Sequence, residues 1–422
     1  MHRIVTIGGG FGGLCAAQSL KNLPVQVTLI DRRNFHLFQP LLYQVATGWL
    51  SPANIASTLR AVLRYQKNAQ VLLAEVTDID AERRKVIFAG GELGYDTLIV
   101  ATGSSHDYFG HDDWKEVAPG LKTIEDATEM RRRIFSAFES AEREHDPAKL
   151  RAWLTFIIVG GGPTGVELAG ALADIANKTL THDFRSIDPA DAQILLVEAS
   201  DRILSTYPEN LSSKAQSFLS HLGVSVQTRT AVAAIRPGQV AVRRGKIYET
   251  IPCQTVLWAA GVRASQLGAA LARRGVASLD RSGRVIVQDD FSLAAHPEIF
   301  VIGDLANYTP RGGKPLPGIA PVAQQAGRYV AKVIGSRLTG KTLPRFEYRE
   351  RGSMAIVGRA TAIADLAGFH LAGFTAWIAW LFVHLMQLVE YQNRVLVLVQ
   401  WGWFYFRRSR AARLITGDKF KS

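Results

Sequence analysis

Two glycine-rich turns are the parts of this chain whose residue types and spacing most directly imply chemistry. The first turn, residues 8–13 (Gly-Gly-Gly-Phe-Gly-Gly), follows the apolar run 3–7 and precedes a helical pattern of small residues. A strand, a G-x-G-x-x-G turn and a helix form a dinucleotide-binding fingerprint, in which glycines let the backbone approach a pyrophosphate. The free N–H groups at the start of the helix then face the phosphates. The turn therefore predicts a dinucleotide site.

The same arrangement recurs about 150 residues later, where the apolar run 155–159 precedes the turn 160–165 (Gly-Gly-Gly-Pro-Thr-Gly). An acid closes the next apolar run in both cases, Asp31 in the first copy and Glu198 in the second. A carboxylate at this position accepts hydrogen bonds from ribose hydroxyls and repels a 2′-phosphate. The second copy therefore favours NADH over NADPH, a preference that the nearby Arg202 is expected to soften. An unrelated glycine-rich turn is the alternative, and two complete copies argue against it.

Composition narrows the class of protein. The chain has 422 residues, of which 47% are hydrophobic and 20% charged, so a disordered or collagen-like chain is excluded. Its only cysteines, Cys15 and Cys253, form no C-x-x-C pair, which argues against a disulfide framework and against thiol–disulfide exchange. We find no metal-ligand spacing and expect no metal site. The first strand begins within three residues of Met1, so we expect no signal peptide.

The expected fold class is α/β, with two Rossmann-like domains and a C-terminal amphipathic segment that docks on a membrane. Runs at 285–287 and 299–304 return the chain to the first domain, which makes that domain discontinuous. Residues 70–100 are expected to form a small β-meander that leads back into the main sheet, and the charged segment 126–151 a surface helix and linker. The expected domain limits are 1–125 with 280–345, 150–279, and 346–422.

The C-terminal part of the chain indicates which kind of partner the net charge of +12 would attract. Such a charge suits either nucleic acid or acidic lipid. The apolar runs 371–389 and 395–406 are rich in tryptophan and are followed directly by arginines, a pattern typical of a helix that lies in the membrane interface. A helical hairpin through the bilayer and a buried core or dimer interface remain alternatives. The residues expected to meet lipid are Trp377, Trp380, Trp401, Trp403, Arg407, Arg408, Arg410 and Arg413.

These features together resemble the type II NADH:quinone oxidoreductases, a family within the flavoproteins that carry two dinucleotide-binding folds. The resemblance spans nearly the whole chain and rests on both glycine turns and on the segments 38–48, 197–199, 258–261, 302–304, 320–325 and 373–385.

The resemblance implies FAD at the first turn and NADH, as co-substrate, at the second. It implies that Asp304 bonds the ribityl chain, that Glu167 lies between nicotinamide and flavin as a positioning or proton-relay group, and that Gln324 and Gln325 lie near the quinone headgroup. The residues expected to bind cofactor are Gly8, Gly10, Phe11, Gly12, Gly13, Asp31, Gln44, Val76, Ala101, Thr102, Gly103, Gly160, Gly162, Thr164, Gly165, Glu198, Ala260, Gly261, Gly303, Asp304 and Ala323.

The implied activity is hydride transfer from NADH to FAD and two-electron transfer to a membrane quinone, without proton pumping. The resemblance implies a monotopic protein on the cytoplasmic face of the inner or plasma membrane, and a homodimer stays open.

One rival is a sulfide:quinone reductase, which needs redox cysteines beside the flavin. Another is a basic flavoprotein that binds nucleic acid or signals, against which the crowding of arginine after the aromatic tail argues. His36 is expected to be a structural histidine rather than a catalyst.

Overall fold

The structure is a computed structural model that describes residues 1–366, 368–407 and 412–416, the side chains of 404–407 excepted. The chain forms two compact units. The first unit comprises Met1–Leu37, Ala56–Ser105 and Val262–Glu350, and the second comprises Phe38–Ile55, His106–Gly261 and Arg351–Ser422. These units group the chain by packing and not by ligand, so the domain limits given above stay a prediction.

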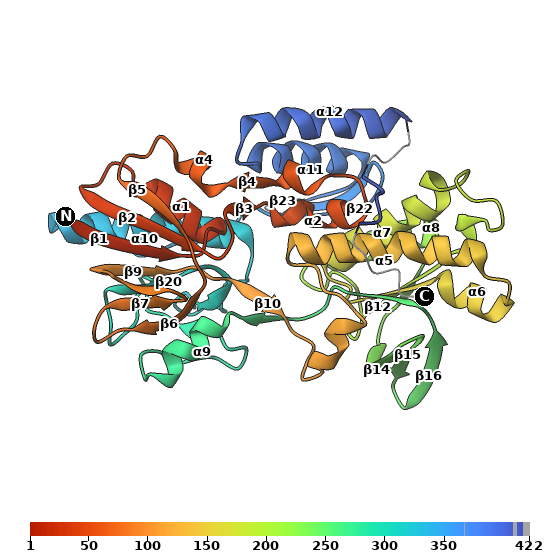
Figure 1. The fold of residues 1–422 in the computed structure, drawn as a ribbon, viewed down its shortest axis with the longest axis horizontal. Coiled ribbons are helices and arrows are strands. Elements are labelled where there is room, and N and C mark those ends of the chain that lie inside the picture. Colours follow the sequence, from red (N-terminus) through yellow and green to blue (C-terminus); the bar gives the residue numbers. More distant parts are fainter. Residues whose placement is uncertain (367, 408–411, 417–422) are drawn as a thin grey trace. The chain divides into compact units, whose positions relative to one another are not determined.

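A five-stranded parallel sheet forms the centre of the first unit (Figure 1). Its strand order is β20-β9-β1-β2-β5, with the bounds β20 (Ile299–Val301), β9 (Thr97–Val100), β1 (His2–Ile7), β2 (Val25–Asp31) and β5 (Ala69–Leu73). Ile7 pairs with both Ile30 and Val100, so three strands end together at one edge. That edge is where the glycine turn begins.

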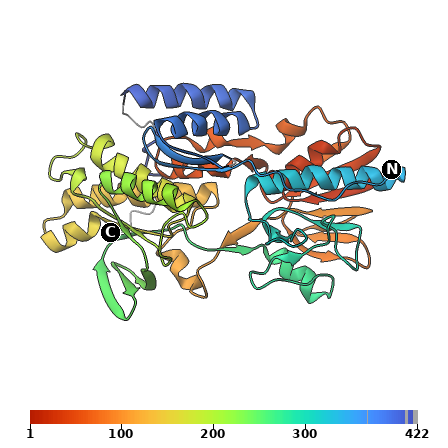
Figure 2. The same ribbon diagram turned by 180° about the vertical axis from the view of Figure 1, so that it is seen from behind.

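Two helices pack closely on this sheet, α1 (Phe11–Ser19) and α10 (Ala320–Thr339), and Figure 2 shows α10, in cyan, running along the sheet. A Cβ at Gly327 would lie 2.3 Å from the carbonyl oxygen of Gly12, so the two helices touch through glycine. The remaining elements of the unit are β3 (Phe35–Leu37), β4 (Ala56–Thr58), α4 (Leu59–Leu63), β6 (Val76–Asp80), β7 (Lys85–Phe88), β8 (Gly91–Gly94), β10 (Ser104–His106), β18 (Val262–Ala264), α9 (Gln266–Arg273), β19 (Val285–Ile286) and β21 (Ala306–Asn307).

The prediction of a β-meander over 70–100 is partly wrong. The strands β6, β7 and β8 do form an antiparallel meander, but β5 instead pairs with β2 at the edge of the main parallel sheet. The short apolar run was too brief to distinguish a parallel edge strand from a hairpin strand. As predicted, β9 returns to the main sheet beside β1.

A four-stranded parallel sheet forms the centre of the second unit, in the order β13-β12-β11-β17. Its strands are β11 (Thr155–Val159), β12 (Gln193–Val197), β13 (Val224–Gln227) and β17 (Thr255–Trp258), and its helices are α5 (Ile124–Arg143), α6 (Pro147–Trp153), α7 (Pro163–Asp174) and α8 (Glu209–His221). A three-stranded antiparallel sheet is made of β14 (Ala231–Arg236), β15 (Gln239–Arg244) and β16 (Ile247–Pro252). The two parallel sheets confirm the predicted α/β fold with two Rossmann-like parts.

The prediction of a surface helix and linker over 126–151 is confirmed for the helix and wrong for the linker, where a second helix forms. A capping box at Thr123 and Asp126 starts α5 earlier, and one face of α5 is buried, including Met130 and Phe138. Pro147 occupies the first turn of a new helix, α6, where its missing N–H costs nothing.

The C-terminal part of the second unit is a three-stranded antiparallel sheet followed by two helices. The elements are β22 (Ser353–Gly358), β23 (Thr361–Leu366), β24 (Phe369–Gly373), α11 (Phe374–Gln387) and α12 (Tyr391–Arg407), and the short helices α2 (Leu42–Ala46) and α3 (Pro52–Ile55) belong to the same unit. A Cβ at Gly170 of α7 would lie 2.2 Å from the carbonyl oxygen of Val357, so α7 and β22 meet backbone to backbone. Within the described residues, no helix combines the length and the apolar character that crossing a membrane requires.

Candidate active site

The first glycine turn is built to receive a phosphate. A Cβ at Gly13 would lie 1.9 Å from the carbonyl oxygen of Gly8, so only glycine lets the turn close this tightly. A Cβ at Gly10, by contrast, would meet no described atom within 4 Å, so the turn is open on that side. No side chain caps the N-terminus of α1, which leaves its N–H groups to an anion. An FAD pyrophosphate fits this cradle.

Asp31 stands at the end of β2 and is held by backbone groups. Its Oδ2 accepts a hydrogen bond from the N–H of Gly9 at 2.6 Å, and its Oδ1 accepts one from the N–H of Arg33 at 2.7 Å. The carboxylate therefore ties the glycine turn to β2 at the place where an adenosine ribose is bound in this fold.

His36 is the structural histidine that the sequence predicts. Its Nδ1 lies 2.9 Å from the carbonyl oxygen of Gly9, and its ring meets the ring of Phe11 edge to face, with centroids 5.0 Å apart. Burial lowers the pKa of His36, so the neutral imidazole donates from Nδ1 to the glycine turn.

Further predicted residues lie at neighbouring strand ends in the first unit. The buried Oγ1 of Thr102 has no hydrogen-bond partner among the described residues, as expected of a group that awaits a ligand. Asp304 accepts a hydrogen bond from the hydroxyl of Ser104, with 2.8 Å between the oxygens. Ala323 lies close to Gly12, whereas Val76 packs against a hydrophobic core at the start of β6.

The two predicted quinone-site glutamines differ in availability. The side-chain amide of Gln325 donates to the carbonyl of Arg349 at 2.9 Å and accepts from its N–H at 3.0 Å. Both hydrogen bonds hold Gln325 against the backbone. Gln324 is half-buried and makes no hydrogen bond to the described residues, so its amide is the one that can meet a ligand.

The second unit repeats the cradle. A Cβ at Gly165 would lie 1.8 Å from the carbonyl oxygen of Gly160, Gly162 is open, and no side chain caps α7. Glu198 accepts hydrogen bonds from the N–H of Gly161 at 2.6 Å and from the hydroxyl of Ser200 at 2.6 Å. The arrangement matches that of Asp31.

The expectation that Arg202 softens the preference for NADH is not supported by its contacts. Its guanidinium donates to the carbonyls of Tyr207 at 2.8 Å and Ser205 at 2.7 Å. Both bonds close the loop that follows β12, and they use two of the five N–H groups of the guanidinium.

Glu167 lies on α7, one turn into the helix, and is buried. Its carboxyl accepts a hydrogen bond from the N–H of Ile356 on β22, and burial raises its pKa well above the usual range. Burial therefore favours the protonated form of this carboxyl.

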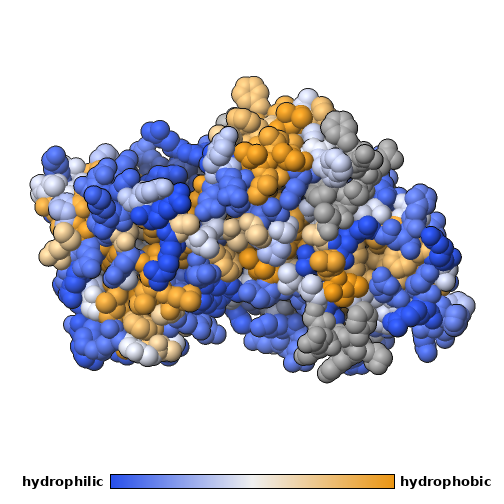
Figure 3. Space-filling model, turned by 45° about the horizontal axis from the view of Figure 1, so that its top comes forward, coloured by the Kyte–Doolittle hydropathy of each residue, from blue (hydrophilic) through white to orange (hydrophobic). Residues whose placement is uncertain are grey.

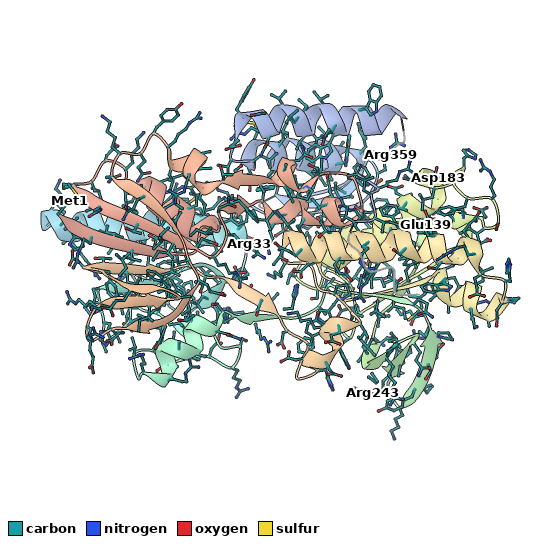
Figure 4. The ribbon with its side chains drawn as sticks, viewed as in Figure 1. Met1, Arg33, Glu139, Asp183, Arg243 and Arg359 are labelled. Atoms are coloured by element: carbon teal, nitrogen blue, oxygen red, sulfur yellow. The ribbon has the colours of Figure 1, made fainter. Side chains whose placement is uncertain are left out.

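The second unit also contains a tryptophan-lined pocket that sequence reasoning missed. It has about 520 Å³ of space, open mouth included, under α11 and α12. Trp377, Trp380 and Trp401 line it together with Gln44 of α2. The hairpin between β22 and β23 closes one side, and Figure 4 labels its residue Arg359. Gln44, predicted to bind cofactor, here accepts a hydrogen bond from the indole N–H of Trp401 at 2.8 Å.

Two of the four predicted lipid-facing tryptophans are misassigned. Trp380 is 1% exposed and Trp401 is 6% exposed, and their rings pack against each other with centroids 5.4 Å apart. Trp403 is exposed and Trp377 half-buried. A helical wheel drawn from sequence alone could not distinguish the two faces, because both faces of α11 and α12 are apolar.

The outer faces of α11 and α12 carry two stripes of exposed apolar and aromatic side chains. Figure 3 shows a patch of hydrophobic residues, in orange, at the top of the molecule where these helices lie. The members of each stripe repeat every fourth residue and so lie on one side of each helix. The stripes are Phe374, Ile378, Phe382 and Met386 on α11, and Tyr391, Val395, Val399 and Trp403 on α12.

Of the predicted lipid-facing arginines, only Arg413 has a described side chain, and it forms an ion pair with Asp183. The side chain of Arg407 lies outside the described residues, as do Arg408 and Arg410.

Residues 2–327 match the family described as pyridine nucleotide-disulphide oxidoreductase, and residues 351–408 match the NDH2 C-terminal domain. The chain thus belongs to the class of flavoproteins with two dinucleotide-binding folds.

Close relatives narrow this class. The chain is 43% identical over 427 residues to the type II NADH:quinone oxidoreductase NdhA of Mycobacterium tuberculosis, covering 99% of this chain and 90% of the relative. It is 42% identical to the type II NADH:quinone oxidoreductase Ndh of the same organism, covering 99% and 91%. Among solved structures, NDH2 of Plasmodium falciparum in complex with NADH has a TM-score of 0.88 at 20% identity, covering 99% of this chain and 100% of the other. The chain belongs to the type II NADH:quinone oxidoreductase family.

Proposed function

We propose that this protein is an FAD-dependent enzyme that oxidises NADH and reduces a membrane quinone, without pumping protons. The observation that carries the proposal is the pair of complete nucleotide cradles, each with its own acid, Asp31 and Glu198. Two cradles in one chain serve two nucleotides, one resident and one exchanging. The relatives named above carry this activity in their names.

The first cradle holds FAD through the glycine turn 8–13, Asp31 and Asp304. When bound, FAD supplies the chemistry, accepting a hydride and passing electrons on to an acceptor. The protein positions the nucleotide and excludes water from it. The uncapped start of α1 and the unpartnered hydroxyl of Thr102 support this assignment.

The second cradle holds NADH. Hydrogen bonds from Gly161 and Ser200 fix the carboxylate of Glu198 in place. A 2′-phosphate bound there would be repelled by its negative charge. Arg202 donates to two carbonyls of its own loop, which holds its guanidinium there.

Glu167 positions the reacting groups and holds a proton. Its raised pKa favours the protonated carboxyl, which can give a proton to a product or stabilise an adjacent anion by hydrogen bonding. Its bond from Ile356 fixes the carboxyl between α7 and the C-terminal sheet.

The tryptophan-lined pocket receives the quinone. Its walls are flat and apolar, which suits a planar ring with an isoprenoid tail. Trp380, whose buried indole N–H has no partner among the described residues, is one of the lining residues.

The stripes on α11 and α12 dock the protein on the bilayer as a monotopic helix pair, on the cytoplasmic face. The α11 stripe contains no charged residue, and α11 is 14 residues long, shorter than a span needs. Docking explains how a lipid-soluble acceptor reaches the protein. A homodimer is a further proposal.

A sulfide:quinone reductase has a similar fold, and the enzyme of that name from Aquifex aeolicus matches with a TM-score of 0.76 at 18% identity. Its chemistry is disfavoured here because neither thiol is activated as a thiolate. Cys15 is on α1 of the first unit and Cys253 is buried at 1% exposure, and burial raises the pKa of both thiols.

Anaerobic stopped-flow spectroscopy tests the proposal. NADH should bleach the flavin of the purified enzyme much faster than NADPH does, and a short-chain quinone should restore the colour. Liposomes containing acidic lipid should retain the protein, and Phe382→Ser with Val399→Ser should release it while leaving flavin bleaching unchanged. If NADH leaves the flavin oxidised, the proposed function is wrong.

A further inference from the structure

Phe109 is an exposed aromatic residue on a backbone conformation that such residues rarely adopt. Its φ is +53° and its side chain is 63% exposed. A left-handed backbone is unfavourable for a bulky residue. Because the ring of Phe109 is largely exposed, hydrophobic burial does little to offset that cost. Strained residues of this kind cluster at functional sites.

The surroundings of Phe109 hold its ring in one place. The N–H of Phe109 donates to the side chain of Asp107 at 2.9 Å, and the carbonyl of Asp107 accepts the indole N–H of Trp258 at 3.1 Å. The phenyl ring lies with its centroid 6.2 Å from that of Trp258. A Cβ at Gly261 would lie 2.8 Å from Cζ of Phe109, so the ring reaches over Gly261.

This place is one end of the nucleotide cradle. In the order β13-β12-β11-β17, Glu198 follows β12, the glycine turn follows β11, and Gly261 comes after β17. A dinucleotide whose adenosine ribose meets Glu198 and whose phosphates cross the glycine turn continues toward β17. A Cβ at Gly160 would lie 2.8 Å from the backbone nitrogen of Ala260, so this strand end directly adjoins the turn. The ring of Phe109 therefore lies at the end of the cradle where the pyridine ring of a bound dinucleotide would be.

We propose that Phe109 is a binding residue for the nicotinamide half of NADH, against which its exposed ring packs. The inference rests on the proposed function, since it takes NADH as the nucleotide of the second cradle. Aromatic contact between two planar rings contributes affinity that depends on the π face and not on charge. The strained backbone supports the role, because it presents the ring outward rather than into the core.

Calorimetric titration of the FAD-loaded enzyme with NAD⁺ and with ADP-ribose tests this role, because ADP-ribose lacks the pyridine ring. Phe109→Ala should weaken NAD⁺ binding about tenfold, the effect of roughly 1.4 kcal/mol of ring contact, and leave ADP-ribose binding unchanged. Phe109→Tyr should keep wild-type affinity for both ligands. Tyr248→Ala is the matched control, since Tyr248 is an exposed aromatic residue on the separate strand β16 and should affect neither ligand.

Three outcomes overturn the inference. They are unchanged NAD⁺ affinity in Phe109→Ala, an equal loss of ADP-ribose and NAD⁺, and a loss of NAD⁺ binding in Phe109→Tyr. Should Phe109→Ala fail to fold, Phe109→Leu retains an apolar side chain without a π face and gives the same contrast. If the wild-type enzyme binds neither ligand, the proposed function fails instead, so the two failures are distinguishable.

Discussion

The side-chain carbonyl of Gln44 accepts a hydrogen bond from the indole N–H of Trp401, 2.8 Å away, across 357 positions of sequence. Both side chains are buried, and the amide of Gln44 also donates to the hydroxyl of Tyr43 at 3.0 Å. The bond ties the short helix α2 to the second docking helix at the wall of the tryptophan pocket. The shape of that pocket therefore depends on a polar contact inside an apolar wall.

Replacing Gln44 should damage the pocket without damaging the nucleotide cradles. Gln44→Leu leaves the indole N–H of Trp401 buried and unpaired, which costs about 1–3 kcal/mol of unfolding free energy. We expect a lower melting temperature and a KM for quinone raised severalfold, with the rate of flavin bleaching by NADH unchanged. Trp401→Phe removes the donor together with part of the buried ring, so it should show the same pattern with a larger loss of stability. A raised KM for NADH instead of quinone would contradict the assignment of this pocket.

Glu198 should set the choice between NADH and NADPH. Glu198→Ala removes the acceptor for the ribose hydroxyls and the charge that repels a 2′-phosphate, so we expect NADH affinity to fall about tenfold and discrimination against NADPH to shrink. Glu198→Gln keeps a hydrogen-bond acceptor for the N–H of Gly161 but carries no charge. Comparing the two variants therefore distinguishes the effect of the charge from that of the hydrogen bond. The measurement is the ratio of kcat/KM for the two nucleotides. An unchanged ratio in Glu198→Ala would remove the ribose assignment.

Glu167 should make stability fall as pH rises above the ordinary carboxyl range. Because burial raises its folded pKa above the unfolded value, the protonated carboxyl contributes stability at low pH that is lost as pH rises through the folded pKa. Glu167→Gln cannot ionise, so its unfolding free energy should fall less than that of the wild type as pH rises from 5 to 9. Urea unfolding of the FAD-loaded enzyme measures this difference, with the exposed Glu82→Gln as control. Equal slopes in Glu167→Gln and wild type would show that Glu167 does not titrate in this range.

The two nucleotide cradles were predictable because local sequence determines them. A strand, a glycine turn and a helix occupy contiguous residues, and the acid follows one strand later, so the pattern that identifies Asp31 and Glu198 needs no tertiary information. Phe109 was missed because nothing in its sequence neighbours predicts a left-handed backbone or a ring that reaches over Gly261, 152 residues away.

The tryptophans of the tail were predicted as a group and only partly placed. Composition showed that α11 and α12 are apolar and aromatic, but which face meets protein depends on packing with α2 and α7, which are remote in sequence. Trp380 and Trp401 therefore lie inside, and residues such as Phe382 and Val399 lie outside. Arg202 illustrates the same limit, since its carbonyl partners belong to a loop whose closure no motif encodes.

His384 should make the docking helices sensitive to acid. Its Nδ1 donates to the carbonyl of Trp380 at 2.8 Å, its ring stacks on that indole with centroids 4.2 Å apart, and burial lowers its pKa to about 4. A histidine with a depressed folded pKa contributes stability above its unfolded pKa, and that stability is lost as pH falls toward the folded value. Between pH 7 and pH 5 the loss is up to about 2 kcal/mol, since one pKa unit corresponds to about 1.4 kcal/mol.

The variant His384→Phe isolates this contribution, because phenylalanine keeps a ring against Trp380 and cannot bind a proton. We expect its unfolding free energy to fall less than that of the wild type on acidification from pH 7 to pH 5. His296→Phe is the control, since His296 faces Glu298 in the first unit, far in sequence from α11. A His384→Phe variant that loses as much stability as the wild type over this range would mean that other groups account for the acid sensitivity of the tail.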